Sequence, residues 1–378
     1  MKSPLFPTEN STDKGRAILN LLGGALWHIP GCFDAAGLLG SRYSLRCVLF
    51  HDVSDTQTWL TRGLGVTICR RDFENALTFI TRHYTPVTLQ DILDNFAGRP
   101  VPKRPVLLTF DDAYASVREV AAPLCAKFDV PAVFFVNGQC LDNRSLALDN
   151  IVCYVANRFG IDAVNAAIRK ANGGANLQVR TLYEVFSIFL PNASVCERDI
   201  FRKVLLEDIG TEESDLAKEA GIYLSSQQLR QLAGFRFEIG DHTYSHANCR
   251  SLSETDFRDE IERNRNELES ISGARVRSFS VPYGSIADLT PVLVAHLRHR
   301  GYEASFLSES RVNTLHADPF RLNRISIKTG EPKVLFSEIE VLPRMRFLRD
   351  LLKTAVTIVR GPEGGELRVP RRANSPQN

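Results

Sequence analysis

The feature that most restricts the fold is a series of seven short apolar runs, which have the pattern of buried strands and alternate with helical patterns. The clearest helical pattern, at 71–83, has apolar residues three and four positions apart, which places them on one face of a helix. Strands that alternate with helices predict an α/β fold with a parallel sheet, open or closed into a barrel. In both arrangements ligands bind beyond the carboxyl ends of the strands. The seven runs are 44–50, 105–110, 132–136, 235–239, 276–280, 302–307 and 322–327.

The segment between the third and fourth runs interrupts this alternation. Residues 140–224 show helix-like periods without a strand pattern, so we expect a mostly helical insertion there. The predicted organisation is an N-terminal extension at 1–43, an α/β body at 44–330 that carries the insertion, and a C-terminal helix with a basic tail at 331–378. The tail has an apolar stripe and an excess of Lys and Arg, which fits either a packed helix with a solvated face or peripheral contact with a membrane surface.

The composition is that of a globular protein, with 44% hydrophobic and 24% charged residues. The net charge of +2 is not the concentrated basic excess of a nucleic-acid-binding domain, so we expect no nucleic acid partner. The eight cysteines form no Cys-x-x-Cys pair, which favours free thiols and a reducing, cytoplasmic location. The apolar run at 17–27 is too short to span a bilayer and resembles a signal sequence mainly in length, so export is the less favoured prediction.

Two adjacent carboxylates, Asp111 and Asp112, directly follow the run at 105–110. Neighbouring carboxylates repel each other unless a cation or a proton lies between them. One of the two can bind a metal ion while the other accepts a proton from water. Aspartate also suits turns and helix N-termini, so this segment alone does not separate a site from a turn.

Two histidines, His242 and His246, follow the run at 235–239. On a helical turn, side chains four positions apart face the same side, which is a usual spacing for metal ligands. With Asp112 they make a set of two histidines and one carboxylate, which leaves coordination positions open for water and substrate. Non-haem iron oxygenases use the same set. The long separation of Asp112 from His242 in the chain makes that alternative weaker.

A third polar segment, Pro282-Tyr283-Gly284, follows the run at 276–280. Proline and glycine on either side would fix the backbone N–H of Tyr283 in an exposed position, as an oxyanion hole requires. Taken alone, the segment is equally compatible with an ordinary turn between a strand and a helix. His51 and Asp52, after the first run, are expected at the same edge of the sheet as substrate-contacting or structural residues.

Thr-Phe-Asp-Asp, His-Thr-x-Ser-His and Pro-Tyr-Gly, in this order and each after a strand, resemble the motifs of the NodB-homology polysaccharide deacetylases, carbohydrate esterase family 4. The resemblance extends from about Leu45 to Ile327 and is interrupted by the insertion. It implies a distorted, TIM-like (β/α)7 barrel. The first two motifs are specific, and the third is looser.

The resemblance also implies a role for each matching residue. Asp111 corresponds to the general base that activates water. Asp112, His242 and His246 correspond to the ligands of a divalent metal ion, usually Zn²⁺. Tyr283 corresponds to the residue whose backbone N–H helps to hold the oxyanion.

The chain departs from the family pattern at several positions. Ala113 lies where glycine is common, and Ser280 lies where many members have an arginine that pairs with the base. Arg324, within the last run, is our candidate for supplying that guanidinium, although a structural ion pair would explain it equally well. The family's general acid is a histidine, and the nearest candidate is His316. Without such a histidine, the proton for the leaving amine comes from water or from Asp111.

The predicted function is that of a metal-dependent hydrolase that removes N-acetyl groups from amino sugars of a polysaccharide, an oligosaccharide or a glycoconjugate. The predicted partner is therefore an N-acetylated carbohydrate. One alternative is an amide hydrolase of the same superfamily with a non-sugar substrate, because the metal motif would be the same. Another is a catalytically silent glycan-binding domain, which would have no need of Asp111.

Overall fold

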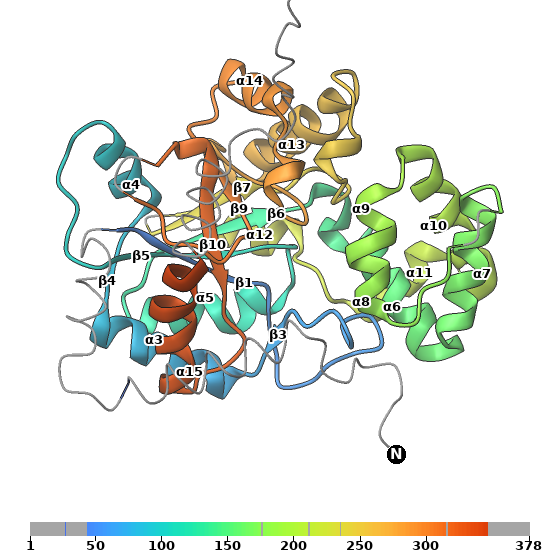
Figure 1. Cartoon of the computed structure of the whole chain (residues 1–378), viewed down its shortest axis with the longest axis horizontal. Helices are drawn as coiled ribbons and strands as arrows, with labels where there is room; N and C mark the ends of the chain where they lie inside the picture. The colour runs from blue at the N-terminus through green and yellow to red at the C-terminus, as the bar shows by residue number, and fades with distance from the viewer. Residues whose placement is uncertain are drawn as a thin grey trace, which may run out of the picture.

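The computed structural model describes Trp27 and residues 44–174, 177–210, 212–234, 236–314 and 317–346. Its main sheet has eight parallel strands, and it closes because β1 pairs with both β10 and β5. The eighth strand, β4, pairs only with the start of β5 and lies outside the closed ring. The prediction of a seven-stranded, TIM-like barrel is confirmed (Figure 1). The strands of the ring are β1 (Arg46–Phe50), β5 (Pro105–Phe110), β6 (Ala132–Val136), β7 (Phe237–Asp241), β8 (Ser278–Ser280), β9 (Ala304–Leu307) and β10 (Leu322–Ser326).

The two faces of the barrel strands contribute to different cores. In β5, Leu108 and Phe110 pack in the large cluster shared with the outer helices, whereas Leu107 belongs to a smaller cluster with Phe135 and Phe306. Successive side chains of a strand point to opposite faces, so the smaller cluster fills the barrel interior. This core fixes the ring of strand ends on which the polar segments lie.

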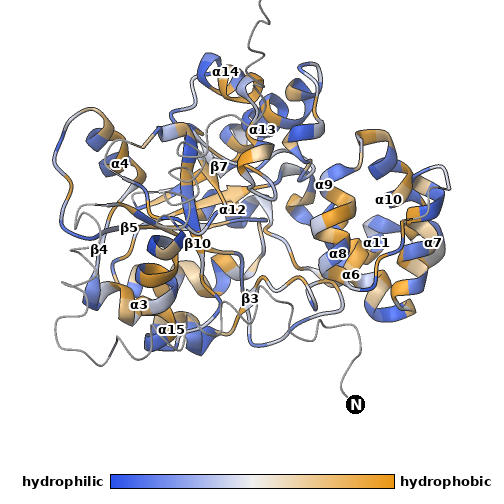
Figure 2. Cartoon of the chain, in the orientation of Figure 1, coloured by the Kyte–Doolittle hydropathy of each residue, from blue (hydrophilic) through white to orange (hydrophobic). Residues whose placement is uncertain are grey.

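The helices outside the barrel each bury one face. In α3 (Arg70–His83) the buried residues include Phe73, Leu77 and Ile80, spaced as the sequence pattern predicts. Figure 2 shows hydrophobic and hydrophilic residues on opposite sides of such helices. The remaining outer helices are α4 (Leu89–Phe96), α5 (Ala122–Lys127), α12 (Ser226–Leu232), α13 (Arg263–Ser272), α14 (Pro291–His299) and α15 (Pro332–Phe336).

The chain between β6 and β7 forms a helical lobe beside the barrel, drawn in green in Figure 1. The lobe has its own hydrophobic core, which includes Ile151, Ile168 and Leu205. Leu60, from the loop before β3 (Thr67–Ile68), also packs in this core, so that loop and the lobe lie against each other. The elements of the lobe are α6 (Leu148–Phe159), α7 (Ile161–Ala171), α8 (Leu182–Glu184), η3 (Val185–Phe189), α9 (Leu190–Asn192), α10 (Val195–Ile209) and α11 (Glu213–Ala220).

Some element boundaries differ from the sequence prediction. The strand predicted at 235–239 is β7 at Phe237–Asp241, and the strand predicted at 276–280 is limited to β8 at Ser278–Ser280. After β8, α14 begins at Pro291 with the Thr290 side chain accepting the N–H of Leu293 as its cap. Proline lacks an N–H and suits the first position of a helix better than its interior, which explains why α14 begins there. The strands β2 (Asp52–Val53), β3 and β4 (Thr85–Pro86) are too short to give a recognisable period.

Several predictions concern residues outside the described part. The extension at 1–43 is described only at Trp27, and the apolar stripe and most of the basic tail lie beyond 346. Among the described residues, no helix is long and apolar enough to cross a membrane.

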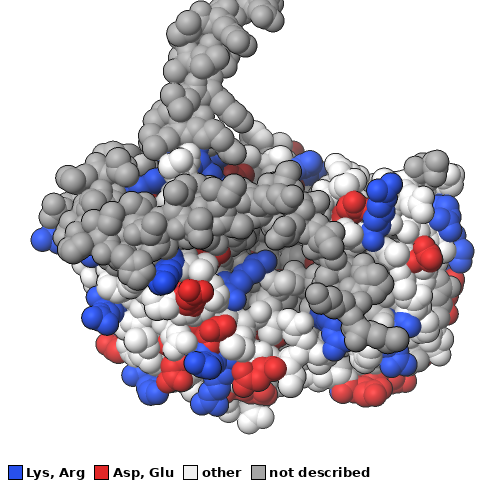
Figure 3. Space-filling view, turned by 60° about the horizontal axis from the view of Figure 1, so that its bottom comes forward, with Lys and Arg blue, Asp and Glu red and all other residues white. Residues whose placement is uncertain are grey.

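The described cysteines are free thiols, most of them buried. On the face shown in Figure 3, the described Lys and Arg residues are interspersed with Asp and Glu.

Candidate active site

The three polar segments meet at the carboxyl end of the barrel. Asp111 and Asp112 follow β5, His242 and His246 follow β7, and Tyr283 follows β8. All five residues line one cavity of about 290 Å³. The barrel therefore brings together side chains that are more than a hundred residues apart in the chain, as the position of each at a strand end predicts.

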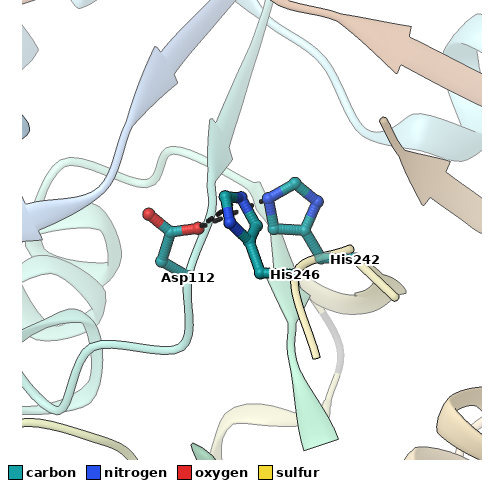
Figure 4. A group of neighbouring side chains, drawn as sticks. All are labelled: Asp112, His242 and His246. Atoms are coloured by element: carbon teal, nitrogen blue, oxygen red, sulfur yellow. Dashed lines mark ion pairs between the residues drawn. The ribbon is translucent and has the colours of Figure 1, made fainter. Parts of the chain in front are cut away.

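Asp112, His242 and His246 point toward a common centre (Figure 4). The Oδ1 atom of Asp112 lies 3.3 Å from Nε2 of His242 and 3.6 Å from Nε2 of His246. Two ligands of a tetrahedral ion with bonds of about 2.1 Å lie about 3.4 Å apart. The two distances from Asp112 are therefore close to those between ligands of one such ion, and the three residues each offer a ligand atom within 4.8 Å of the others.

The two histidines do not lie on a helical turn, which corrects the interpretation of their spacing. The segment after β7 is a loop in which Thr243 and His246 have positive φ angles of 59°. An N–H of this loop, that of Thr243, binds the Asp241 side chain at 2.9 Å. The left-handed residues turn the chain so tightly that both imidazoles face the cavity without a helix.

Each imidazole is oriented through its other nitrogen. Nδ1 of His242 lies 2.8 Å from the carbonyl oxygen of Ser280, and Nδ1 of His246 lies 2.9 Å from Oδ2 of Asp149. A carbonyl or carboxylate at Nδ1 favours the tautomer that carries its proton there. Nε2 of both rings is then free to donate a lone pair toward the shared centre.

Asp111 is held by Arg324, which lies inside the barrel on β10. Nη1 and Nη2 of the guanidinium bind Oδ1 and Oδ2 of the carboxylate at 2.7 and 2.8 Å. The same Nη2 donates to Ser280 Oγ at 2.8 Å, and that hydroxyl donates to Asp111 at 3.0 Å. The small Ser280 side chain thus leaves room for a guanidinium that comes from another strand.

The charges around the two aspartates keep both of them ionised. Burial by itself raises the pKa of Asp111, but Arg324 and the nearby imidazoles outweigh burial, so its pKa lies below the ordinary value. Burial likewise raises the pKa of Asp112, and the contact with His242 and the charge of His246 lower it further than burial raises it. The two adjacent carboxylates therefore coexist in their ionised forms at neutral pH.

Tyr283 lies in a strained turn, with a φ angle of 62°. Gly284 follows with a φ of 68°, and a Cβ atom at this glycine would lie 2.4 Å from the backbone nitrogen of Ser308. Only glycine fits this approach. Tyr283 lines the cavity, and among the described residues no carbonyl accepts its N–H.

His51 and Asp52 have separate positions. His51 is half-buried and lines the cavity, whereas Asp52 accepts hydrogen bonds from Ser116 at 2.7 Å and Thr67 at 2.8 Å. Asp52 therefore joins chain segments rather than facing the cavity. His316 lies outside the described residues, so its prediction as general acid stays untested.

The sequence model of the polysaccharide deacetylase family matches residues 98–184 and 190–304, more than half of the chain. The chain belongs to this family. The resemblance found in its motifs is confirmed, as is the prediction of a hydrolase that acts on carbon–nitrogen bonds other than peptide bonds. No curated protein shows significant sequence similarity to this deacetylase.

A solved deacetylase structure shares the fold. The Streptococcus pyogenes deacetylase PplD, solved in complex with acetate, superposes with a TM-score of 0.52 at 13% identity, over 79% of this chain and 100% of PplD. IcaB from Ammonifex degensii has 19% identity and a TM-score of 0.49, over 78% of this chain and 97% of IcaB. At 13% identity the similarity to PplD concerns the fold alone, and the roles of this deacetylase's residues are argued from its own geometry.

Two residues at the site were missed by the sequence analysis. Asp149 contacts His246, and the guanidinium of Arg198 donates to the His246 carbonyl oxygen at 3.1 Å and to the Tyr283 hydroxyl at 3.3 Å. Both belong to the helical lobe, on α6 and α10. An acid in the first turn of a helix and a charge on a helix face carry no signal of a site, because both patterns are common on helix surfaces.

Proposed function

We propose that this deacetylase is a metal-dependent hydrolase that removes N-acetyl groups from amino sugars of a polysaccharide, oligosaccharide or glycoconjugate. The observation that carries the proposal is the convergence of Asp112, His242 and His246 beside the Arg324-paired carboxylate of Asp111. A metal site next to an ionised general base is an arrangement that can catalyse amide hydrolysis.

The donor set supports a divalent ion, with zinc as the best fit. Two imidazole nitrogens and one carboxylate oxygen are usual ligands of catalytic zinc, which keeps a fourth position open. When bound, the ion would act as a Lewis acid that polarises the acetamide carbonyl and acidifies water. Asp112, His242 and His246 would hold it at the edge of the cavity.

Asp111 is the group proposed to take a proton from the attacking water. Its low pKa keeps it ionised, and the two bonds from Arg324 fix its orientation. The N–H of Tyr283 would donate to the oxygen of the acetamide as negative charge develops there. Asp111, once protonated, is placed to return its proton to the leaving amine, and His51 in the cavity wall would contact the substrate.

A non-sugar amide remains the second candidate substrate. The cavity wall also includes the apolar residues Leu64, Val66 and Phe186, whose side chains do not hydrogen-bond to sugar hydroxyls. Family membership favours the carbohydrate, and a substrate panel separates the two. The panel would contain N-acetylated amino sugars of increasing length beside N-acetylated amines without a sugar.

The test is metal-dependent release of acetate. The purified protein would be stripped with a chelator and reloaded with Zn²⁺, and acetate would be measured for each substrate. We expect no release from the stripped protein, recovery with metal, and loss of both activity and bound metal in His242→Ala. Full activity in the stripped protein would contradict the proposal. Release of acetate only from non-sugar amides would favour the second candidate substrate instead of the carbohydrate.

A further inference from the structure

We infer that Asp149, on the helical lobe, is a positioning residue for the metal ligand His246. The inference rests on the proposed metal site and goes beyond it, because it makes the lobe part of the metal centre. Asp149 lies in the first turn of α6, outside the barrel and its strand ends. Its Oδ2 atom nevertheless lies 2.9 Å from Nδ1 of His246.

This contact is largely shielded from water. The exposed fractions of the His246 and Asp149 side chains are 11% and 13%. A charge-assisted hydrogen bond between such groups is shielded from competing water and is stronger than one at the surface. With its proton held at Nδ1, His246 presents the lone pair of Nε2 to the centre it shares with Asp112, 3.6 Å away.

The loop that carries His246 gives a reason for this support. His246 has a left-handed backbone, a conformation that costs free energy for any residue except glycine. The lobe holds the loop from a second side, because Arg198 of α10 donates to the His246 carbonyl oxygen at 3.1 Å. His242, by contrast, is oriented by the Ser280 carbonyl within the barrel.

Asp149 is itself held in place from both sides. The hydroxyl of Tyr283 donates to its Oδ1 atom at 3.2 Å. The next residue, Asn150, donates to the carbonyl oxygen of Leu60 at 2.9 Å and so ties α6 to the loop before β3. The carboxylate therefore has little freedom, and its position depends on how the lobe sits against the barrel. The lobe thus completes the orientation of one of the three proposed ligands.

The experiment measures metal affinity directly, by competition between the protein and a chromogenic chelator for Zn²⁺. We expect Asp149→Ala to weaken Zn²⁺ affinity by about 10–100-fold, the usual effect of removing a carboxylate behind a histidine ligand. Asp149→Asn should lose less, because its amide oxygen still accepts the Nδ1 proton. The matched control is Asp162→Asn, an exposed acid in the first turn of α7, which should bind Zn²⁺ as the wild type does.

Thermal unfolding of the same variants separates positioning from a merely structural role. A positioning role predicts that Asp149→Asn keeps the metal-free melting temperature and has a smaller rise on addition of Zn²⁺. Wild-type Zn²⁺ affinity in folded Asp149→Ala, or in Asp149→Asn if the alanine variant does not fold, would overturn the inference. Zn²⁺ affinity is measured without substrate, so the two proposals can fail separately. If Asp149→Ala weakens Zn²⁺ binding but the wild type releases no acetate from any substrate, the proposed function is refuted and the role of Asp149 stands.

Discussion

Arg324 and Asp111 form a buried, bidentate ion pair although 213 positions separate them in the chain. Their side chains are 0% and 3% exposed. The guanidinium also donates to the carbonyl oxygen of Leu307 at 3.0 Å, which fixes its plane. The pair sets both the charge and the direction of the proposed base, so it is the first place to test the mechanism.

Replacing Arg324 should change the pH dependence of the reaction. In Arg324→Gln the positive charge beside Asp111 is gone, so the pKa of Asp111 should rise and the acidic limb of kcat/KM should move to higher pH. The unpaired buried carboxylate should also lower the free energy of unfolding by about 3–5 kcal/mol. Arg324→Lys is the control, because it keeps the positive charge. Its kcat/KM should fall, but the acidic limb of its pH profile should move less than in Arg324→Gln. An unmoved limb in Arg324→Gln would remove Arg324 from this role.

Asp111→Asn separates the base from the metal ligands. The amide cannot accept a proton, so kcat should fall by about 10²-fold or more, the typical contribution of a general base. Bound metal should stay at the wild-type level, because Asp112, His242 and His246 are intact. Asp112→Asn is the companion variant and should lose metal affinity. Elemental analysis with acetate release measures both, and normal hydrolysis by Asp111→Asn would show that the roles are misassigned.

Gly284→Ala tests the turn that carries Tyr283. The new methyl group would meet the backbone nitrogen of Ser308 at 2.4 Å, so the turn must shift and move the N–H of Tyr283. We expect kcat to fall while Zn²⁺ affinity stays near that of the wild type. Gly273→Ala is a matched control, because Gly273 also has a positive φ, of 69°, but no atom lies within 4 Å of the added Cβ. It should cost about 1–2 kcal/mol of stability and leave kcat unchanged.

Glu340 should make stability depend on pH. It pairs with Arg46 through two contacts of 3.1 Å and accepts the Tyr84 hydroxyl at 2.8 Å. Burial raises its pKa, but Arg46 and Arg344 outweigh burial, so the pKa in the folded protein lies below the ordinary value. Its contribution is therefore complete above the unfolded-state pKa of about 4.3 and is lost as the pH falls through the lower folded value.

Glu340→Gln should remove this contribution and lower the free energy of unfolding by about 3–5 kcal/mol at pH 7, because it leaves buried arginines without a carboxylate. The difference from wild type should shrink in acid. The control is Glu74→Gln, which breaks a surface pair with Lys127 and should change stability far less. Urea unfolding at several pH values measures both, and an equal effect of the two variants would contradict the argument.

The residue types at the metal site could be predicted from the sequence because each follows a strand. Asp111 and Asp112 directly follow β5, and His242 directly follows β7, so the topology of the barrel brings them to the same end. The loop conformation could not be predicted in this way. A spacing of four suggests a helix, and only the left-handed residues Thr243 and His246 show how the loop achieves the same convergence.

What the sequence determined by itself is the alternation of strands and helices, and the proposed ligands and base at the strand ends. These depend on local patterns, which the chain carries within a few residues. The sequence offered Arg324 either as the partner of Asp111 or as a member of a structural ion pair elsewhere, and only the tertiary structure decided that it pairs with Asp111. Only the tertiary structure, likewise, brought Asp149 of the lobe against His246. Both contacts join segments that meet only when the barrel closes and the lobe packs beside it, so no local pattern encodes them.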